Sequence, residues 1–222
     1  MRKSSGLLLG LVVLISCSPK EEPPQVEKES RVASLPYYQD VNFTPHWISP
    51  GSDSLNNFHQ IPAFSLFNQK GDTFTEKSFQ DKIYVSDFFF SICPGICPKM
   101  TANMEKVQEA FLEDDEVLLL SHSVMPEHDS VEVLYEYAQN KGVKSEKWHL
   151  VTGDRQEIYH LGRYHYFVEE DLGLLKDPEE FLHTENFVLV DKNRRIRGIY
   201  NGLNTGSVNQ LIADIKTLKA ES

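Results

Sequence analysis

The sequence predicts an α/β fold in which a central mixed β-sheet is flanked by helices. Short and almost continuously apolar runs at 83–90 and 117–124 are typical of strands that are buried on both faces. Each run is followed by a segment with apolar residues at helical spacing, at 98–111 and 130–141. Because alternating strands and helices pack as layers around one sheet, this order indicates the fold class.

An added hairpin is expected before the first buried strand. Segments 63–67 and 73–75 flank the sequence Asn-Gln-Lys-Gly-Asp at 68–72, and its glycine suits a tight turn. Residues 35–47 are aromatic and irregular, and we expect them to lie over the domain surface. Helix is disfavoured through this region by prolines at positions 36, 45, 50 and 62.

The second half of the chain predicts a characteristic ending. A brief strand at 148–152 and a helix at 154–161 precede a pair of strands at 187–191 and 196–200, and a last helix covers 208–218. This β-β-α ending is that of a thioredoxin-like domain. A cysteine motif between the first buried strand and its helix fits the same fold.

Length and charge restrict the possible functions. A chain of 222 residues suits one domain with a tail and leaves little room for two. Acidic residues outnumber basic ones by 33 to 22, a formal net charge of −11, and no basic stripe is visible. We therefore expect no nucleic-acid partner.

The N-terminus has the features of a lipoprotein signal peptide. A positive start at 1–3 precedes an apolar run at 6–15, which is too short to span a bilayer as a helix. The run ends in Leu-Ile-Ser-Cys at 14–17, which resembles a bacterial lipobox, with Cys17 as the lipidated residue. The alternative is an ordinary signal peptide with an unrelated cysteine, but no A-x-A cleavage site follows.

This pattern divides the chain into three parts. Residues 1–16 are the expected signal peptide, 17–55 a lipid-anchored linker and irregular segment, and 56–222 the thioredoxin-like domain. The polar, proline-containing sequence after Cys17 has too little apolar surface to fold. The predicted location is the bacterial cell envelope, anchored to a membrane by lipid, with the domain outside the cytoplasm on the periplasmic side.

Cys93 and Cys97 carry the strongest chemical signal. They lie in Cys-Pro-Gly-Ile-Cys-Pro at 93–98, where a strand leads into a helix. Free N–H groups and the helix dipole at such a position favour the thiolate, which is the reactive and metal-binding form. The pair alone leaves three interpretations: a structural disulfide, a redox dithiol or a metal site. The short loop counts against the first, because closing it adds comparatively little stability.

A third ligand would favour the metal. Of the eight histidines, His183 is distinguished by its position directly before the strand that starts near 186. In a thioredoxin-like layout, that loop packs beside the cysteine turn. His122, at the end of the second buried strand, is the next candidate.

Several motifs together resemble the Sco/SenC family of copper-binding proteins, between Ile61 and Leu218. The similarity lies in Asp-Phe-Phe-Phe at 87–90, the cysteine motif with Met-Thr at 100–101, Trp-His-Leu-Val-Thr-Gly-Asp at 148–154, and His-Thr at 183–184 before 187–191. The resemblance implies that Cys93, Cys97 and His183 bind one copper per chain, as Cu(I) or Cu(II). Two thiolates suit Cu(I) and an imidazole suits both states. Zinc could use the same ligands.

One position departs from the family pattern. Met125 stands before Pro126, where the family usually has aspartate. Met125 either packs against the domain or offers a thioether near the metal, which would favour Cu(I).

The resemblance implies a copper chaperone that delivers copper to, or prepares, the binuclear copper centre of cytochrome c oxidase during assembly. Its partners would be the copper-bearing oxidase subunit or another copper chaperone, and the membrane through the lipid anchor. The alternatives are a thiol-disulfide reductase acting through Cys93 and Cys97, which would be the only enzymatic activity, and a copper or redox sensor.

Overall fold

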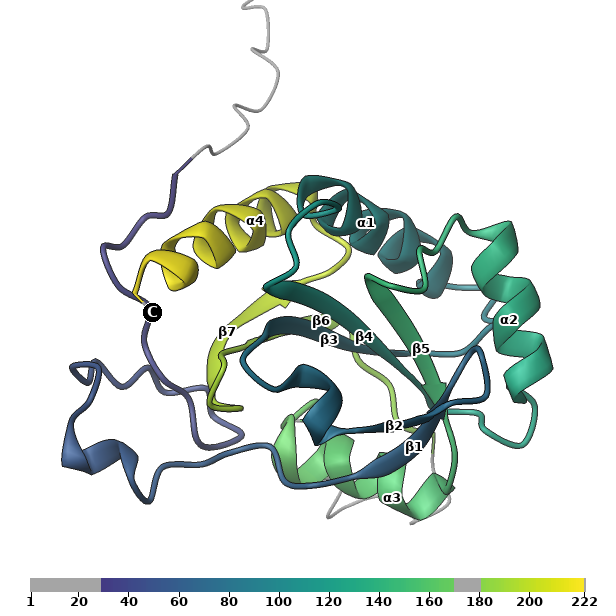
Figure 1. Cartoon of the computed structure of the whole chain (residues 1–222), viewed down its shortest axis with the longest axis horizontal. Coiled ribbons are helices and arrows are strands. Elements are labelled where there is room, and N and C mark those ends of the chain that lie inside the picture. The colour runs from purple at the N-terminus through teal and green to yellow at the C-terminus, as the bar shows by residue number, and fades with distance from the viewer. Residues whose placement is uncertain (1–28, 170–180, 222) are drawn as a thin grey trace, which may run out of the picture.

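The computed structural model of the protein describes residues 29–169 and 181–221 and confirms the predicted fold class. Seven strands form one mixed sheet in the order β2-β1-β5-β4-β3-β6-β7 (Figure 1). Strands β3, β4 and β5 run parallel, and the outer pairings are antiparallel. The strand bounds are β1 Ser65–Asn68, β2 Thr73–Thr75, β3 Ile83–Phe89, β4 Val117–Ser123, β5 Trp148–Thr152, β6 Asn186–Val190 and β7 Ile196–Asn201.

Helices cover both faces of the sheet and divide the interior into two main cores. Helices α1 and α4 lie side by side over one face, α2 lies near the β5 end, and α3 lies on the opposite face (Figure 1). The helix bounds are α1 Cys97–Ala110, α2 Val131–Asn140, α3 Arg155–His160 and α4 Thr205–Ala220, with short 3₁₀ turns η1 Asp53–Leu55 and η2 Glu76–Phe79.

The two central strands β3 and β4 are buried along their whole length. All residues of β3 and β4 are buried, and β3 is paired along its length with β4 and over three residues with β6. Successive side chains of a strand point to opposite faces, so β3 contributes Val85 and Phe89 to the core under α1 and Tyr84 and Phe88 to the other. The carboxyl end of β3 is therefore held from both faces and along its edge with β4, to which it is paired as far as Phe89.

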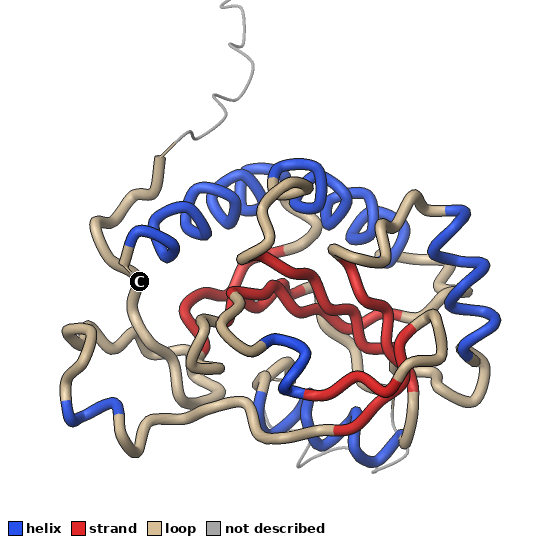
Figure 2. Tube along the Cα trace, in the orientation of Figure 1, coloured by secondary structure: helices blue, strands red, loops and turns tan. Residues whose placement is uncertain are grey.

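The irregular segment before the sheet packs more deeply than expected. It runs along one end of the domain as loops (Figure 2), and Leu35 and Tyr37 in it are buried. Tyr37 and Tyr38 form bridges with His46 and Ile196. The Arg197 guanidinium lies 4.0 Å from the Tyr37 ring centroid, so the segment is fixed to the sheet by a cation–π contact.

Helix α3 continues in a way that the sequence did not predict. It passes into a π-helical turn, η3, at Leu161–His165 rather than ending near Leu161. A side chain at Gly162 would clash there, because a Cβ would lie 2.6 Å from Leu182 Cδ1. The absence of a side chain lets the segment before β6 approach η3. In the described part of the chain, no helix is long and apolar enough to cross a membrane.

Candidate metal centre

The two cysteines lie at the junction of β3 and α1. The backbone N–H of Cys93 donates to Phe90 O at 3.3 Å, which closes a turn directly after the strand. Helix α1 begins at Cys97, and its N-cap residue Ile96 makes no side-chain cap. The N-terminal N–H groups of α1 are therefore available to the loop sulfurs. Both cysteines are free thiols, with Cys93 half-buried and Cys97 buried.

Cys93 is the thiol that ionises more easily. Burial alone would raise its pKa, but hydrogen bonds from the Cys97 backbone N–H and the Cys97 thiol, and from the N–H groups of Gly95 and Ile96, outweigh burial and lower the pKa. These donors belong to the loop and the start of the helix, where they stabilise negative charge. The direction of this shift agrees with the expectation that the helix start favours the thiolate form.

Cys97 has the opposite character. Burial raises the pKa of its thiol to about 12, although a backbone hydrogen bond from Phe90 acts in the other direction. Its hydrogen bond to Cys93 contributes to the rise, because it holds the proton on Cys97 while Cys93 accepts. The pair therefore has one half-buried sulfur whose ionisation is favoured and one buried sulfur whose ionisation is disfavoured.

His183 lies on a well-packed segment but has an exposed side chain. The ring of Phe181 meets that of Phe90 edge-on, with centroids 4.9 Å apart, and Leu182 is buried. These contacts bring the segment before β6 next to the cysteine turn, as the sequence predicts. Among the described residues, however, no group of three or more His, Cys, Asp or Glu side chains is placed to hold a metal ion. His183 stays a predicted ligand, and it must swing inward to join the sulfurs.

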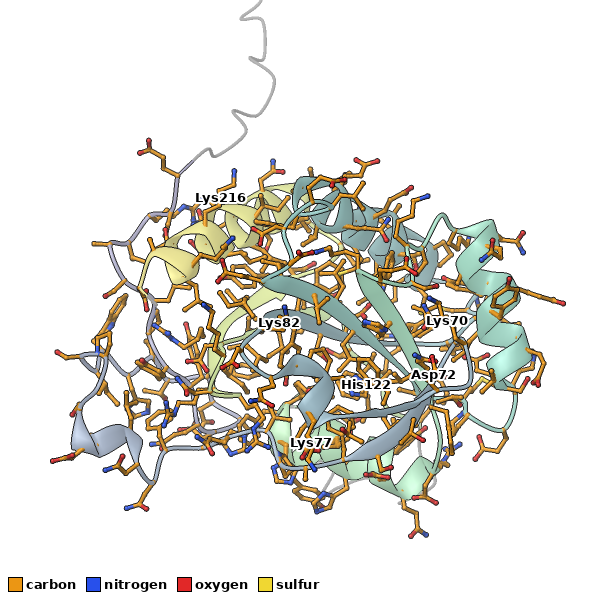
Figure 3. All side chains as sticks on the ribbon, viewed as in Figure 1. Lys70, Asp72, Lys77, Lys82, His122 and Lys216 are labelled. Carbon is orange, nitrogen blue, oxygen red and sulfur yellow. The ribbon has the colours of Figure 1, made fainter. Side chains whose placement is uncertain are left out.

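His122 faces the wrong core to be an alternative ligand. It is fully buried between Phe88 and Tyr166, and its ring is nearly parallel to that of Phe88, with centroids 4.7 Å apart. Both partners belong to the core opposite α1, and Figure 3 labels His122 on that side of the sheet. Burial lowers its pKa to about 3, and its Nε2 has no hydrogen-bond partner in the described structure. Successive side chains of β4 point to opposite faces of the sheet, and this alternation turns His122 away from the core that contains Cys97.

A buried carboxylate that the sequence analysis missed fixes the cysteine turn. Asp129 is fully buried, and its Oδ2 accepts from the Ser91 N–H at 3.0 Å and the Ser123 hydroxyl at 2.6 Å. Its Oδ1 accepts from the Ser91 hydroxyl at 2.5 Å. Ser123 also accepts from the N–H of Met125, which is half-buried. Only the position of Asp129 before the α2 cap, Ser130, was visible in the sequence, and it gave no sign of this role.

A second buried carboxyl, that of Asp87, lies on β3 before the cysteine turn. The Ser121 hydroxyl donates to Asp87 and in turn accepts from Trp148 Nε1 at 2.8 Å. Burial raises the pKa of Asp87 to about 7, with the Ser121 hydrogen bond opposing the rise. Asp87 also disfavours ionisation of Cys97, because two negative charges would repel each other in a buried setting.

The donor chemistry of this site fits copper. Two sulfurs converge at one helix start, and the chain segment with an imidazole packs against the same turn. Thiolates select soft ions such as Cu(I), and an added imidazole also suits Cu(II). The residues present therefore fit a copper ion, which Cys93 and Cys97 would hold and which His183 would complete after moving inward.

The comparisons with known proteins decide the family. The family model described as SCO1/SenC matches residues 52–220, which is more than half of the chain. The chain belongs to the SCO1/SenC family. This confirms the resemblance that was based on the cysteine motif and the segments around Trp148 and His183. Among its SCO1/SenC relatives, the "SCO1 protein homolog" of Bacillus subtilis (strain 168) is 29% identical over 169 residues, covering 74% of this chain and 84% of the relative.

Solved structures of SCO1/SenC relatives share the fold. BsSco, described as a member of the Sco family of cytochrome c oxidase assembly proteins with a disulfide switch, is 28% identical, with a TM-score of 0.62 over 73% of this chain and 94% of that one. Copper-bound ScoI of Bradyrhizobium japonicum is 25% identical, with a TM-score of 0.55 over 71% of this chain and 98% of that one. These matches confirm the thioredoxin-like fold.

Asp87→Asn should change how stability depends on pH. The folded protein holds the Asp87 proton more tightly than the unfolded chain does, because the pKa is raised from 3.8 to about 7. Asp87 therefore makes the free energy of unfolding fall as pH rises through this window, by at most about 1.4 kcal/mol per pH unit. Asparagine has no such titration and can still accept from Ser121. Denaturant unfolding at pH 5 and pH 8 measures the free energy of unfolding of both proteins. Relative to the wild type, the variant should be more stable at pH 8 than at pH 5. An equal difference between the two proteins at both pH values would contradict the raised pKa of Asp87.

Proposed function

We propose that this protein is a copper chaperone that delivers copper to, or prepares, the binuclear copper centre of cytochrome c oxidase. The observation that carries the proposal is the unequal thiol pair at the start of α1, one half-exposed with a lowered pKa and one buried. Support comes from the relatives, since BsSco belongs to a family of cytochrome c oxidase assembly proteins and ScoI of B. japonicum has copper bound.

Transfer would proceed by ligand exchange with copper as the cargo. Cys93 is the accessible sulfur, so it forms the first bond to an incoming ion and breaks the last bond to a departing one. Cys97 binds next and releases its proton, because a bound cation offsets the cost of a buried thiolate. His183 closes the site from the segment before β6, and its exposed position allows it to leave first when an acceptor thiol approaches. The oxidation state of copper does not change in these steps.

A thiol-disulfide reductase is the second candidate. Its support is the lowered pKa of Cys93, which suits a nucleophile, next to Cys97 as the resolving thiol. The disulfide switch described for BsSco is consistent with such chemistry in a relative. In this mechanism Cys93 attacks an acceptor disulfide, Cys97 then resolves the mixed disulfide, and the acceptor leaves with two thiols while Cys93 and Cys97 form a disulfide.

The location is part of the proposal. The sequence at 14–17 supports lipid attachment at Cys17 and exposure of the domain on the outer side of a bacterial membrane. Residues 1–28 lie outside the described part of the structure, so this proposal depends on the sequence pattern alone.

Removing the proposed ligands should separate their roles in copper binding. The purified protein should bind about one copper and show thiolate-to-copper charge-transfer absorption with Cu(II). Cys93→Ser or Cys97→Ser should abolish the absorption. His183→Ala should weaken Cu(II) at least roughly tenfold and Cu(I) less, because two thiolates can hold Cu(I) in a near-linear site. Titration against copper buffers measures both, with His160→Ala as an exposed-histidine control. Equal Cu(II) affinity in wild type and His183→Ala would remove His183 from the ligand set.

A strain that lacks the protein should assemble less active cytochrome c oxidase when copper is limiting, and added copper should partly restore it. A chaperone raises local delivery of copper, so a higher concentration of free copper can substitute for it by mass action. A reductase predicts rescue by a membrane-permeant thiol reductant and none by copper. Normal oxidase activity in the deletion strain at limiting copper would contradict both mechanisms and leave sensing as the function to test.

Cys17→Ser should prevent lipid attachment, because the apolar run at 6–15 is too short to anchor the protein as a spanning helix. Metabolic labelling with a fatty acid in the native host measures the modification, and the Cys93→Ser variant is the matched cysteine control. Equal label on the Cys17→Ser variant and the wild type would exclude the lipobox.

A further inference from the structure

The loop after β4 presents a histidine in the orientation of a metal ligand. His128 Nδ1 lies 2.9 Å from Asp129 Oδ1, and its side chain is 39% exposed. Metal-binding histidines commonly donate one ring N–H to a carboxylate, which fixes the tautomer and directs the other nitrogen to the metal.

The hydrogen bonds of Asp129 determine which ring nitrogen carries the proton. The four contacts on its carboxylate come from the Ser91 N–H, the Ser91 and Ser123 hydroxyls, and His128 Nδ1. The other three contacts are hydrogen bonds donated to the carboxylate oxygens, and a proton on Nδ1 completes the same pattern. With the proton on Nδ1, the lone pair of the imidazole is on Nε2, on the side of the ring that faces away from the buried carboxylate.

The same contacts place this imidazole beside the cysteine turn. Ser91 Oγ lies 3.5 Å from His128 Nδ1, and Ser91 precedes Cys93 by two residues within a closed turn. The backbone of His128 is also fixed, because its N–H donates to Met125 O at 2.9 Å and its carbonyl accepts from Ser130 at 2.9 Å. His128 therefore keeps a constant position relative to the more exposed of the two sulfurs.

We propose that His128 is a copper-transfer ligand, which binds the ion through Nε2 as copper passes between its carrier and Cys93. This inference depends on the proposed copper function of the cysteine pair. As the carrier's donor is released, a bond from copper to Nε2 forms, and this bond is then replaced by a bond to the Cys93 sulfur. The oxidation state is unchanged, and any thiol proton goes to water. Among the described residues, no preassembled three-ligand centre is present. His128 Nε2 would therefore act as a single donor.

The test is the rate of copper loading in the full-length protein. His128→Asn keeps an amide N–H near the position of Nδ1, so Asp129 retains a donor, but it removes Nε2. With Cu(II)-glycine as the copper source, stopped-flow absorption of the thiolate-copper band should form on the order of tenfold more slowly in this variant. The final amplitude should stay close to that of the wild type, because Cys93 and Cys97 are intact.

His46→Asn is the matched control. His46 is also a loop histidine, but its Nε2 lies 3.5 Å from the neutral side-chain nitrogen of Gln39 and not beside a carboxylate. It should load copper at the wild-type rate, and equal thermal unfolding midpoints of all three proteins would show that the fold is unchanged. A wild-type loading rate in His128→Asn would overturn the inference while leaving the proposed function intact. If the band never forms in the wild type, the copper function of the cysteines fails instead.

Rapid freeze-quench electron paramagnetic resonance provides a second measurement. Early Cu(II) intermediates in the wild type should show the signal of a remote imidazole nitrogen, which glycine cannot supply, and this signal should be lost in His128→Asn and kept in His183→Ala. Loss of the early nitrogen signal in His183→Ala alone would assign the entry step to His183 and overturn the role of His128.

Discussion

The fixed carboxyl end of β3 is the constraint on which the rest of the site depends. The strand is buried on both faces and paired with β4 as far as Phe89, and β6 pairs with it over Tyr84–Ser86, so the chain leaves the sheet at a defined point. The turn that follows brings Cys93 and Cys97 to the N-terminus of α1. The helix N–H groups act on these sulfurs only because strand and helix are held in this relative position by the core between them.

Asp129 connects this turn to the loop after β4, although burying a carboxylate removes its hydration. A buried carboxylate without partners would take up a proton, but two hydroxyls and a backbone N–H compensate for its lost hydration. The loop itself is exposed, and the side chain of Ile92 in it is 54% exposed. Anchoring Ser91 from below lets this exposed loop remain ordered without a large apolar contact.

The sequence predicted the features that depend on local residue patterns, and it missed those that depend on contacts between segments far apart in the chain. The strands, the order of the helices and the cysteine pair follow from apolar periodicity and from the motif at 93–98. The π-turn at Leu161–His165 and the clamp at Asp129 could not be predicted, because each depends on contacts between distant segments. His122 lies near the end of β4 and therefore close to the site along the chain, but its side chain points to the opposite face of the sheet. For His183, the sequence predicted that its segment lies beside the cysteine turn, but it did not predict that the side chain is exposed.

The inequality of the two thiols links the electrostatics of the site to the order of events during transfer. An ion that arrives from solvent meets the half-exposed Cys93, whose thiolate is already favoured by N–H donors from the loop and from Cys97. Cys97 is buried and keeps its proton until a cation is near, with the carboxyl of Asp87 further opposing ionisation. In the proposed transfer, copper itself would therefore drive the second deprotonation, so binding of the second sulfur would follow the first. Release would run in reverse: after His183 has left, Cys97 would be reprotonated, which leaves copper on the half-exposed Cys93 sulfur where an acceptor thiol can attack. The buried proton thus helps the site to give up its ion, because it favours the singly bound state from which exchange can occur.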